Sequence, residues 1–240
     1  QFSINRCKNL LDNLLPEKLD LPSMVRDNRL HMTELGLHFS RTSNGVSRLH
    51  GEVARKQFPM YQIDHITNGV HHSYWVGSAF SKLFDCYLKG WRGRPELLKN
   101  VDKIPDNEFW STHQKQKSKL LDFANSEMQK ALDVDTLTIG FARRAATYKR
   151  ANLIFENMER MVKIGKHKIQ IIFSGKAHPN DKEGKELIKE IIQKGNYLFG
   201  DIKVIFLENY NMWLGKLITS GVDLWLNTPL RPNEASGTSG

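Results

Sequence analysis

The chain has 240 residues, 40% of them hydrophobic, which is enough to bury a substantial core in one or two domains and excludes a disordered chain. Its 35 Lys and Arg residues against 26 Asp and Glu residues give a formal net charge of +9, which favours anionic ligands. No apolar run approaches the roughly 18 residues of a membrane span, and the N-terminal sequence lacks a secretory pattern, so we expect a cytoplasmic protein with no membrane partner.

The basic residues gather on helix-like segments such as 113–119 and 163–168. This pattern is typical of solvated helix faces, so a nucleic-acid partner is not expected. The two cysteines, Cys7 and Cys86, lie far apart in the sequence, and they indicate neither a disulfide framework nor a zinc site.

The first half of the chain has a mainly helical pattern. Apolar residues recur at helical spacing over 25–56 and 71–90, and 108–132 is expected to form one long amphipathic helix. The Gly- and Pro-containing segment 90–95 interrupts this pattern. No sheet is visible in the sequence before about residue 134.

Beyond residue 134, expected strands alternate with expected helices. The strands are short runs rich in β-branched and aromatic residues, namely 136–142, 168–174, 202–207 and 222–227. The helices between them cover 151–164, 181–193 and 211–220. This alternation predicts an α/β fold with a parallel, doubly wound sheet, in which ligand chemistry takes place at the carboxyl ends of the strands.

Polar clusters follow each expected strand, which points to a single cleft. The turn at 143–150 carries several cations, whose guanidiniums suit bidentate contact with a phosphate, while the ammonium of Lys149 suits a point contact. A solvated basic loop is the alternative for this turn. The other clusters are 174–179, 208–211 and 234–240. The cluster at 174–179 lacks the GxxxxGK[ST] spacing, which excludes an ATP-binding P-loop.

The segment EASGTSG at 234–240 follows the last expected strand. The backbone N–H groups of such a turn are suited to a sugar hydroxyl or a phosphate, although a flexible loop is the alternative. Earlier in the chain, His65, His71 and His72 have no carboxylate or thiol at ligand spacing, so no metal site is expected. Asn68, between these histidines, begins an Asn-Gly turn whose amide can face a sugar.

Several of these segments, in the order in which they occur, resemble the glycogen and α-glucan phosphorylases. They are SRTSNGVSRLHGEV at 40–53, HITNGVHHSYW at 65–75, GFARRAATYKRANLI at 140–154, FSGKAHPND at 173–181, VIFLENYNMWLGKLI at 204–218 and NEASGTSG at 233–240. The resemblance covers the chain from about residue 32 to its end and implies the two-Rossmann-domain glycosyltransferase architecture (GT-B type). Residues 1–134 would then be the helical C-terminal part of the first domain, and 135–240 the first half of the second, cofactor-binding domain.

The resemblance also implies roles for particular residues. Arg144 and Lys149 look like the catalytic pair that binds the substrate phosphate, and Tyr148 lies beside the glucosyl pocket. The amide of Asn68 looks like the group that forms a hydrogen bond with a hydroxymethyl oxygen of glucose. The groups that look suited to hydrogen bonds with the other sugar hydroxyls are Glu234, Ser236 and Gly237.

The cofactor implied by the resemblance is pyridoxal 5′-phosphate. Arg143 stands near the expected cofactor phosphate, and Tyr210 looks like a neighbour of the cofactor. Thr238 and Ser239 look like part of the turn that holds the 5′-phosphate. The lysine that forms the Schiff base is expected just beyond Gly240, in a pattern of the type SG-Met-Lys, so it is absent from this chain and the chain resembles an interior fragment.

Two residues depart from the common family pattern. Asn211 stands where many members carry an Arg, and Ser239 where many carry a Gly. Both variants recur in shorter microbial members of the family.

The implied reaction is phosphorolysis of glycogen, starch or maltodextrin by inorganic phosphate to α-D-glucose 1-phosphate, with retention of configuration. The cofactor phosphate would assist the acid–base chemistry, and no protein carboxylate pair is needed. One alternative is a nucleotide-sugar-dependent glycosyltransferase of the same architecture, and another is a noncatalytic basic binding module. The sequence leaves open the preferred glucan, the regulation, the activity of this chain by itself and the oligomeric state, a homo-oligomer included.

Overall fold

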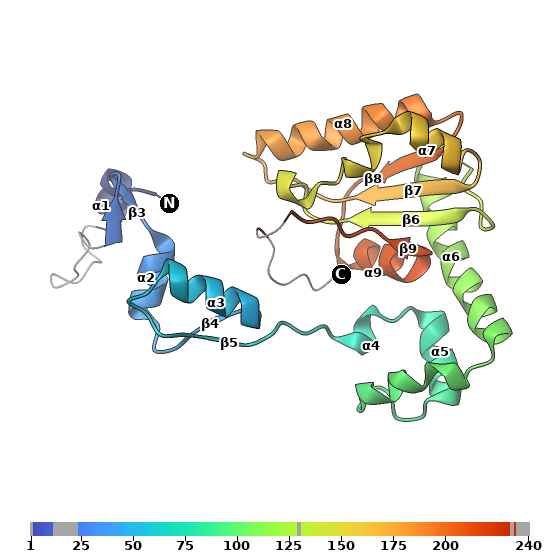
Figure 1. Cartoon of the computed structure of the whole chain (residues 1–240), viewed down its shortest axis with the longest axis horizontal. Coiled ribbons are helices and arrows are strands. Elements are labelled where there is room, and N and C mark those ends of the chain that lie inside the picture. The colour runs from blue at the N-terminus through green and yellow to red at the C-terminus, as the bar shows by residue number, and fades with distance from the viewer. Residues whose placement is uncertain (1, 12–23, 129–130, 231–232, 234–240) are drawn as a thin grey trace. The chain divides into compact units, whose positions relative to one another are not determined.

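The computed structural model of the protein describes residues 2–11, 24–128, 131–230 and 233 (Figure 1). The chain divides into two compact units, Gln1–Asn68 and Gly69–Gly240. Each unit has its own elements and is described by itself.

The first unit is built from short elements. They are β1 (Phe2–Ser3), α1 (Ile4–Leu11), β2 (Val25–Arg26), β3 (Arg29–Leu30), α2 (Met32–Phe39), β4 (Ser43–Gly45), α3 (Arg48–Gln57) and β5 (Ile63–His65). β1, β3 and β2 form an antiparallel sheet in that order, whereas β4 and β5 pair in parallel. The expectation of no sheet before residue 134 is therefore wrong, because strands of two or three residues are too short to show the alternation that reveals a strand.

β4, α3 and β5 form a small βαβ unit that depends on close backbone packing. A Cβ atom added at Gly45 would lie 2.5 Å from the backbone nitrogen of Gly51, so glycine at this position lets α3 approach β4. Arg55 then ties α3 to β5, because its Nη1 donates to the carbonyl oxygen of Ile63 at 2.6 Å.

The second unit begins with helices. They are α4 (His72–Trp75), α5 (Ser78–Tyr87), the 3₁₀ segment η2 (Pro95–Lys103) and α6 (Asp106–Met128). The fully buried Trp91 packs with Phe84 and Ile104 in a core shared by these elements. Its indole Nε1 donates to Asp85 Oδ1 at 2.8 Å, so the polar atom of the ring is paired. The long helix expected over 108–132 is confirmed, with its end at Met128.

A four-stranded parallel sheet follows the long helix. Its strands are β6 (Leu137–Ala142), β7 (Ile169–Ser174), β8 (Lys203–Leu207) and β9 (Leu224–Trp225). They lie in the order β8-β7-β6-β9, and every pairing between them is parallel. The prediction of a parallel sheet is confirmed, and the carboxyl ends of its strands consequently lie at one edge.

Helices cover both faces of this sheet (Figure 1). They are α6, α7 (Met158–Gly165), α8 (Lys182–Leu198) and α9 (Met212–Gly221). Ile139 and Phe141 of β6 pack in the core that contains residues of α7 and α8, whereas Ala142 packs in the core that contains residues of α6 and α9. This alternation of side chains along β6 gives the doubly wound arrangement that the sequence predicts.

Polar caps set helix boundaries that the apolar spacing did not predict. In place of one helix over 151–164, a 3₁₀ turn, η4 (Leu153–Phe155), precedes α7. Asn157 begins α7, because its side-chain oxygen accepts a hydrogen bond from the amide of Arg160 at 2.8 Å. Asp181 caps α8 in the same way, and that helix continues past the predicted end at 193 to Leu198.

A buried ion pair anchors α6 at the amino ends of β6 and β9. Lys117 is 2% exposed, and its Nζ donates to Asp223 Oδ2 at 2.6 Å and to the carbonyl oxygen of Thr136 at 2.8 Å. His113 Nε2 lies 2.6 Å from Asp223 Oδ1, and the amide of Thr138 donates to Oδ2 at 2.7 Å. Burial acts to raise the pKa of Asp223, but the hydrogen bonds that it accepts, led by that from Lys117, lower this pKa below its ordinary value.

α6 precedes the predicted domain boundary at 134/135, yet it shares a core with the sheet. Leu120, Leu121 and Ala124 belong to the same buried cluster as Ile172 of β7. The boundary near 134 stays a prediction. None of the helices in the described residues is long and apolar enough to cross a membrane.

Replacing Lys117 with Met should destabilise the protein by about 3–5 kcal/mol, because it leaves the buried Asp223 carboxylate without its cation. The double variant Lys117→Met/Asp223→Asn should recover part of that loss. Chemical denaturation at neutral pH measures both values. Lys189→Met is the matched control, since Lys189 pairs with Glu186 at the surface, where the side chains are 61% and 72% exposed, and it should be neutral. Equal stability of the two single variants would contradict the anchoring role.

Candidate active site

The edge formed by the carboxyl ends of β6, β7, β8 and β9 carries three of the polar clusters that the sequence predicts, and the fourth, 234–240, lies outside the described residues. The segments that follow these strands are 143–150, 175–179, 208–211 and 226–230. Ser174 joins two strand ends, because its buried hydroxyl donates to the carbonyl oxygen of Leu207 at 2.7 Å. The described clusters therefore emerge side by side.

The ladder between β6 and β7 continues past the ends of the strands. The amide of Arg143 donates to the carbonyl oxygen of Ser174 at 3.2 Å, and the amide of Ala145 donates to that of Lys176 at 3.0 Å. Gly175, between these two acceptors, has φ of 156°, and a Cβ atom there would lie 2.1 Å from the carbonyl oxygen of Arg143. Glycine at 175 is thus required for the turn after β6 to lie against the turn after β7.

Arg144, Tyr148 and Lys149 form a cluster at the end of β6, on the turn that leads into the 3₁₀ segment η3 (Thr147–Lys149). Arg144 is exposed, and its Nη2 donates to the hydroxyl of Tyr148 at 3.1 Å. Lys149 is 8% exposed, and its Nζ lies 4.9 Å from the centroid of the Tyr148 ring. Burial acts to raise the pKa of Tyr148, but the hydrogen bond from Arg144 and the charge of Lys149 lower this pKa below its ordinary value.

The segment that follows β9 holds the backbone of this cluster. Thr228 Oγ1 donates to the carbonyl oxygen of Lys149 at 3.1 Å, and the amide of Leu230 donates to that of Tyr148 at 2.7 Å. Arg150 has a left-handed backbone with φ of 51°, and its Nε donates to the carbonyl oxygen of Thr228 at 2.8 Å. Residues 228–230, named the strap, thereby hold the backbone of Tyr148 and Lys149 in place.

Arg143 and Tyr210 lie near each other at the same edge. Arg143 is 8% exposed, and its Nη1 donates to the side-chain oxygen of Asn227. Burial raises the pKa of the Tyr210 phenol, and the positive charge of Arg143 acts on it in the opposite direction. A buried cation and a half-buried aromatic ring therefore stand together after β6 and β8.

Tyr210 and Asn211 are fitted to the start of α9. A Cβ atom at Gly215 would lie 2.8 Å from the hydroxyl oxygen of Tyr210, so this glycine makes room for the ring. Asn211 caps the helix, because its Oδ1 accepts a hydrogen bond from the amide of Leu214 at 2.9 Å. An asparagine at 211 thus has a local structural role that an arginine would not fill.

Asn68 lies in the first unit, after β5, and is exposed. Its amide donates to the carbonyl oxygen of Val46 at 2.9 Å, and the amide of Ile66 donates to that of Gly45 at the same distance. The two Asn-Gly-Val motifs, at 44–46 and 68–70, are therefore joined by a hydrogen bond from Asn68 to Val46 beyond the end of the β4–β5 pair.

The remaining sequence-predicted residues lie outside the described part of the chain. They are Glu234, Ser236, Gly237, Thr238 and Ser239. The histidines have local roles: His71 accepts a hydrogen bond from the amide of Tyr74 as the cap of α4, and His72 Nε2 lies 3.3 Å from the carbonyl oxygen of Trp91. Among the residues that the structure describes, no group of three His, Cys, Asp or Glu side chains could hold a metal ion.

Sequence reasoning missed Asn227 and the strap. It placed a strand over 222–227, whereas β9 covers only Leu224–Trp225, and the chain then turns toward the cluster. The signal that could have revealed this change is the sequence Asn-Thr-Pro at 227–229, which is typical of a turn.

Comparison with known proteins gives consistent matches. A sequence model of the family described as carbohydrate phosphorylase matches residues 5–240. Maltodextrin phosphorylase of Thermococcus litoralis is 37% identical over 89% of this chain and 29% of its own length. Glycogen phosphorylase of Aquifex aeolicus is 35% identical over 87% of this chain and 34% of its own length, and that of Mycobacterium tuberculosis is 31% identical over 88% and 28%. The chain thus spans no more than 34% of the length of these relatives.

Gly175→Ala should lower the free energy of unfolding by about 2 kcal/mol or more, because the new Cβ atom meets the carbonyl oxygen of Arg143 and the backbone cannot move away without breaking the ladder. Gly200→Ala is the matched control, since a Cβ atom there has no neighbour within 4 Å and this glycine has no positive φ. Thermal unfolding compares the two variants. A Gly175→Ala protein as stable as Gly200→Ala would refute the close approach.

The phenol of Tyr148 should lose its proton at a lower pH than an ordinary tyrosine. The tyrosinate absorbance of the protein minus that of Tyr148→Phe, followed against pH, isolates this group. In Arg144→Gln the same difference should move to higher pH, because a neutral amide replaces the guanidinium that stabilises the anion. A titration that is unaffected by Arg144→Gln would show that the two side chains are not in contact.

Proposed function

This chain belongs to the carbohydrate phosphorylase family, and we propose that it forms an interior part of an α-glucan phosphorylase. The proposed reaction is the cleavage of glycogen, starch or maltodextrin by inorganic phosphate to give α-D-glucose 1-phosphate. The names of the relatives, maltodextrin phosphorylase and glycogen phosphorylase, support it. The observation that carries it is the cluster of Arg144, Tyr148 and Lys149 at the carboxyl end of β6.

Arg144 and Lys149 are the residues that we assign to the attacking phosphate. The exposed guanidinium of Arg144 can make two parallel hydrogen bonds to phosphate oxygens. The ammonium of Lys149 is buried, where a charge acts more strongly on its neighbours than it does in water. Tyr148 contacts both cations and so orients them before the phosphate binds.

The proposed chemistry follows from the negative charge that develops on the substrate phosphate during the reaction. A proton passes from the phosphate to the glycosidic oxygen, the bond from C1 to that oxygen breaks, and a phosphate oxygen bonds to C1 of the glucosyl group. The phosphate gains negative charge as it gives up its proton, and Arg144 and Lys149 stabilise that charge in the transition state. The phosphate supplies both the acid and the nucleophile, so the pair of carboxylates that a glycosidase requires is not needed.

Pyridoxal 5′-phosphate fits the chemistry of the described residues at the same edge. The buried guanidinium of Arg143 suits the phosphate of this cofactor, and Tyr210 offers an aromatic ring close to that charge. When bound, the cofactor supplies a phosphate group that supports the acid–base work of the substrate phosphate. Thr238 and Ser239, outside the described residues, are assigned to the turn that holds it.

The resemblance to the family carries the assignment of residues to the glucosyl group. Tyr148 and Asn68 are the assigned contacts among the described residues, and Glu234, Ser236 and Gly237 complete the set outside them. We further propose the two-Rossmann-domain architecture, in which residues 1–134 end the first domain and 135–240 begin the second. A cytoplasmic location and retention of the α configuration belong to the same proposal.

In the longer polypeptide, Lys149→Ala should lower kcat by about 10²-fold or more, because the lost charge acts at the transition state. Arg144→Ala should also raise the KM for phosphate, because a bidentate contact is lost. The assay is the phosphate-dependent release of glucose 1-phosphate from maltodextrin.

Arg160→Ala and Lys163→Ala, which remove exposed cations of α7, are the matched controls and should leave both constants unchanged. Near-normal kinetics of Lys149→Ala or Arg144→Ala would place the phosphate elsewhere. Turnover that requires a nucleotide sugar and ignores phosphate would instead identify a glycosyltransferase of the nucleotide-sugar-dependent class.

A further inference from the structure

Arg150 comes directly after Lys149 and has a left-handed backbone, with φ of 51° and ψ of 47°. Residues that carry a Cβ atom rarely adopt this conformation, whereas glycine adopts it readily. Strain of this kind persists only where the surrounding contacts over-determine the backbone. The contacts of the Arg150 side chain are therefore the place to look for the reason that an arginine stands here.

Arg150 and Thr228 hold each other by reciprocal hydrogen bonds. Arg150 Nε donates to the carbonyl oxygen of Thr228 at 2.8 Å, and Thr228 Oγ1 donates to the carbonyl oxygen of Arg150 at 3.3 Å. The same hydroxyl donates to the carbonyl oxygen of Lys149 at 3.1 Å. Because a hydroxyl has one proton, this proton is shared between the two carbonyl oxygens. The side chain of one residue and the hydroxyl of the other thus tie the strap to the end of η3.

These ties act where η3 leaves its backbone unpaired. The amides of Lys149 and Arg150 form the hydrogen bonds of this short helix, which ends here. The last carbonyl groups of a helix have no partner inside it. Thr228 supplies a partner for the carbonyl oxygen of Lys149, and the amide of Leu230 supplies one for that of Tyr148. The backbone that carries the phenol and the ammonium is consequently held by η3 on one side and by the strap on the other.

The side chains of the cluster are close enough to respond to this backbone. Lys149 Nζ lies 4.9 Å from the centroid of the Tyr148 ring, and Arg144 Nη2 lies 3.1 Å from its hydroxyl oxygen. Lys149 is 8% exposed, so its packed side chain has little freedom to compensate for a displaced backbone. We propose that Arg150 and Thr228 are positioning residues, which act on the substrate phosphate through the ammonium of Lys149. This role rests on the function proposed above.

Kinetics of the longer polypeptide test the role, in the phosphate-dependent cleavage of maltodextrin. Thr228→Val removes the hydroxyl and keeps the shape of the side chain, while Arg150→Gly removes the guanidinium and permits the left-handed backbone without strain. Each should lower kcat by about tenfold, the effect of one lost hydrogen bond, and change the KM for phosphate by less than about twofold, because Arg144 still binds phosphate. Thr228→Ser keeps the hydroxyl and should have a kcat within about twofold of the original value.

A pH titration of Tyr148 separates positioning from a purely structural role. Burial raises the pKa of Tyr148, whereas the hydrogen bond from Arg144 and the charge of Lys149 lower it. Thr228→Val changes no charge, so a shift of the tyrosinate absorbance to higher pH in this variant reports that the ammonium lies farther from the phenol. Subtracting the absorbance of the same protein with Tyr148→Phe isolates the group. This measurement needs no substrate and does not depend on the proposed reaction.

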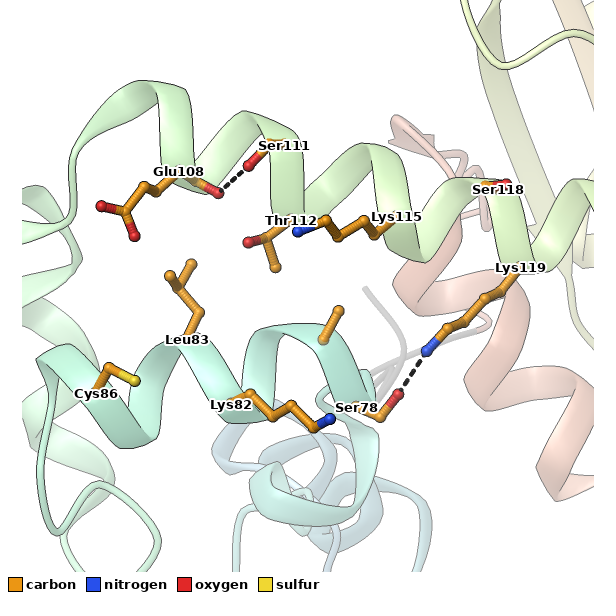
Figure 2. A pocket seen from close by; sticks show the side chains of 11 residues that line it. Ser78, Lys82, Leu83, Cys86, Glu108, Ser111, Thr112, Lys115, Ser118 and Lys119 are labelled. Atoms are coloured by element: carbon orange, nitrogen blue, oxygen red, sulfur yellow. Dashed lines mark hydrogen bonds between the residues drawn. The ribbon is translucent and has the colours of Figure 1, made fainter.

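Two controls remove hydroxyls that donate to carbonyl oxygens elsewhere. Thr219→Val removes a bond of 2.8 Å to Gly215 in α9. Ser111→Ala removes a bond of 3.1 Å to Glu108, which Figure 2 shows on α6, beside the pocket that this helix forms with α5. Both controls should leave kcat and the titration of Tyr148 unchanged.

An unchanged titration in Thr228→Val would overturn the positioning role. So would a kcat of Thr228→Ser that is as low as that of Thr228→Val. A shifted titration in Thr228→Val together with a normal kcat of Lys149→Ala would support the positioning and refute the assignment of Lys149 to the phosphate.

Discussion

The close backbone approach at Gly175 is the constraint on which the candidate active site depends. It allows the turn after β6 to run against the turn after β7, so the hydrogen-bond ladder extends beyond both strands. The directions in which Arg143 and Arg144 leave the sheet follow from this extension. A parallel sheet supplies the shared edge, but the glycine determines how closely the cationic turn lies to it.

The two ends of the sheet use polar groups in opposite ways. At the amino ends, Lys117 and Asp223 neutralise each other in a buried network that fixes α6. At the carboxyl ends, Arg144 is left exposed while Lys149 is buried beside a phenol. The charges at the amino ends pair with each other, whereas the guanidinium of Arg144 at the carboxyl ends is exposed to solvent. The same strands thus carry a buried ion pair at one end and an exposed cation at the other.

The longer strands of the parallel sheet could be predicted from the sequence, whereas features that depend on single contacts could not. Apolar runs at 136–142, 168–174 and 202–207 each coincide with a strand to within a residue, because buried parallel strands are continuous in their hydrophobicity. The cationic turn was likewise predicted from its composition. The β4–β5 pair, the cap at Asn157 and the partner of Arg143 at Asn227 depend on single contacts between residues, which apolar spacing does not encode.

The strap links the exit of β9 to the turn after β6 through main-chain oxygens. Thr228 and Leu230 donate hydrogen bonds to the carbonyl oxygens of Lys149 and Tyr148, so the strap is tied to the backbone that carries both side chains. Glu234 follows Leu230 by only a few residues in the sequence. The backbone of two residues assigned to the substrate is therefore held in part by a segment that lies outside the regular strands of the sheet.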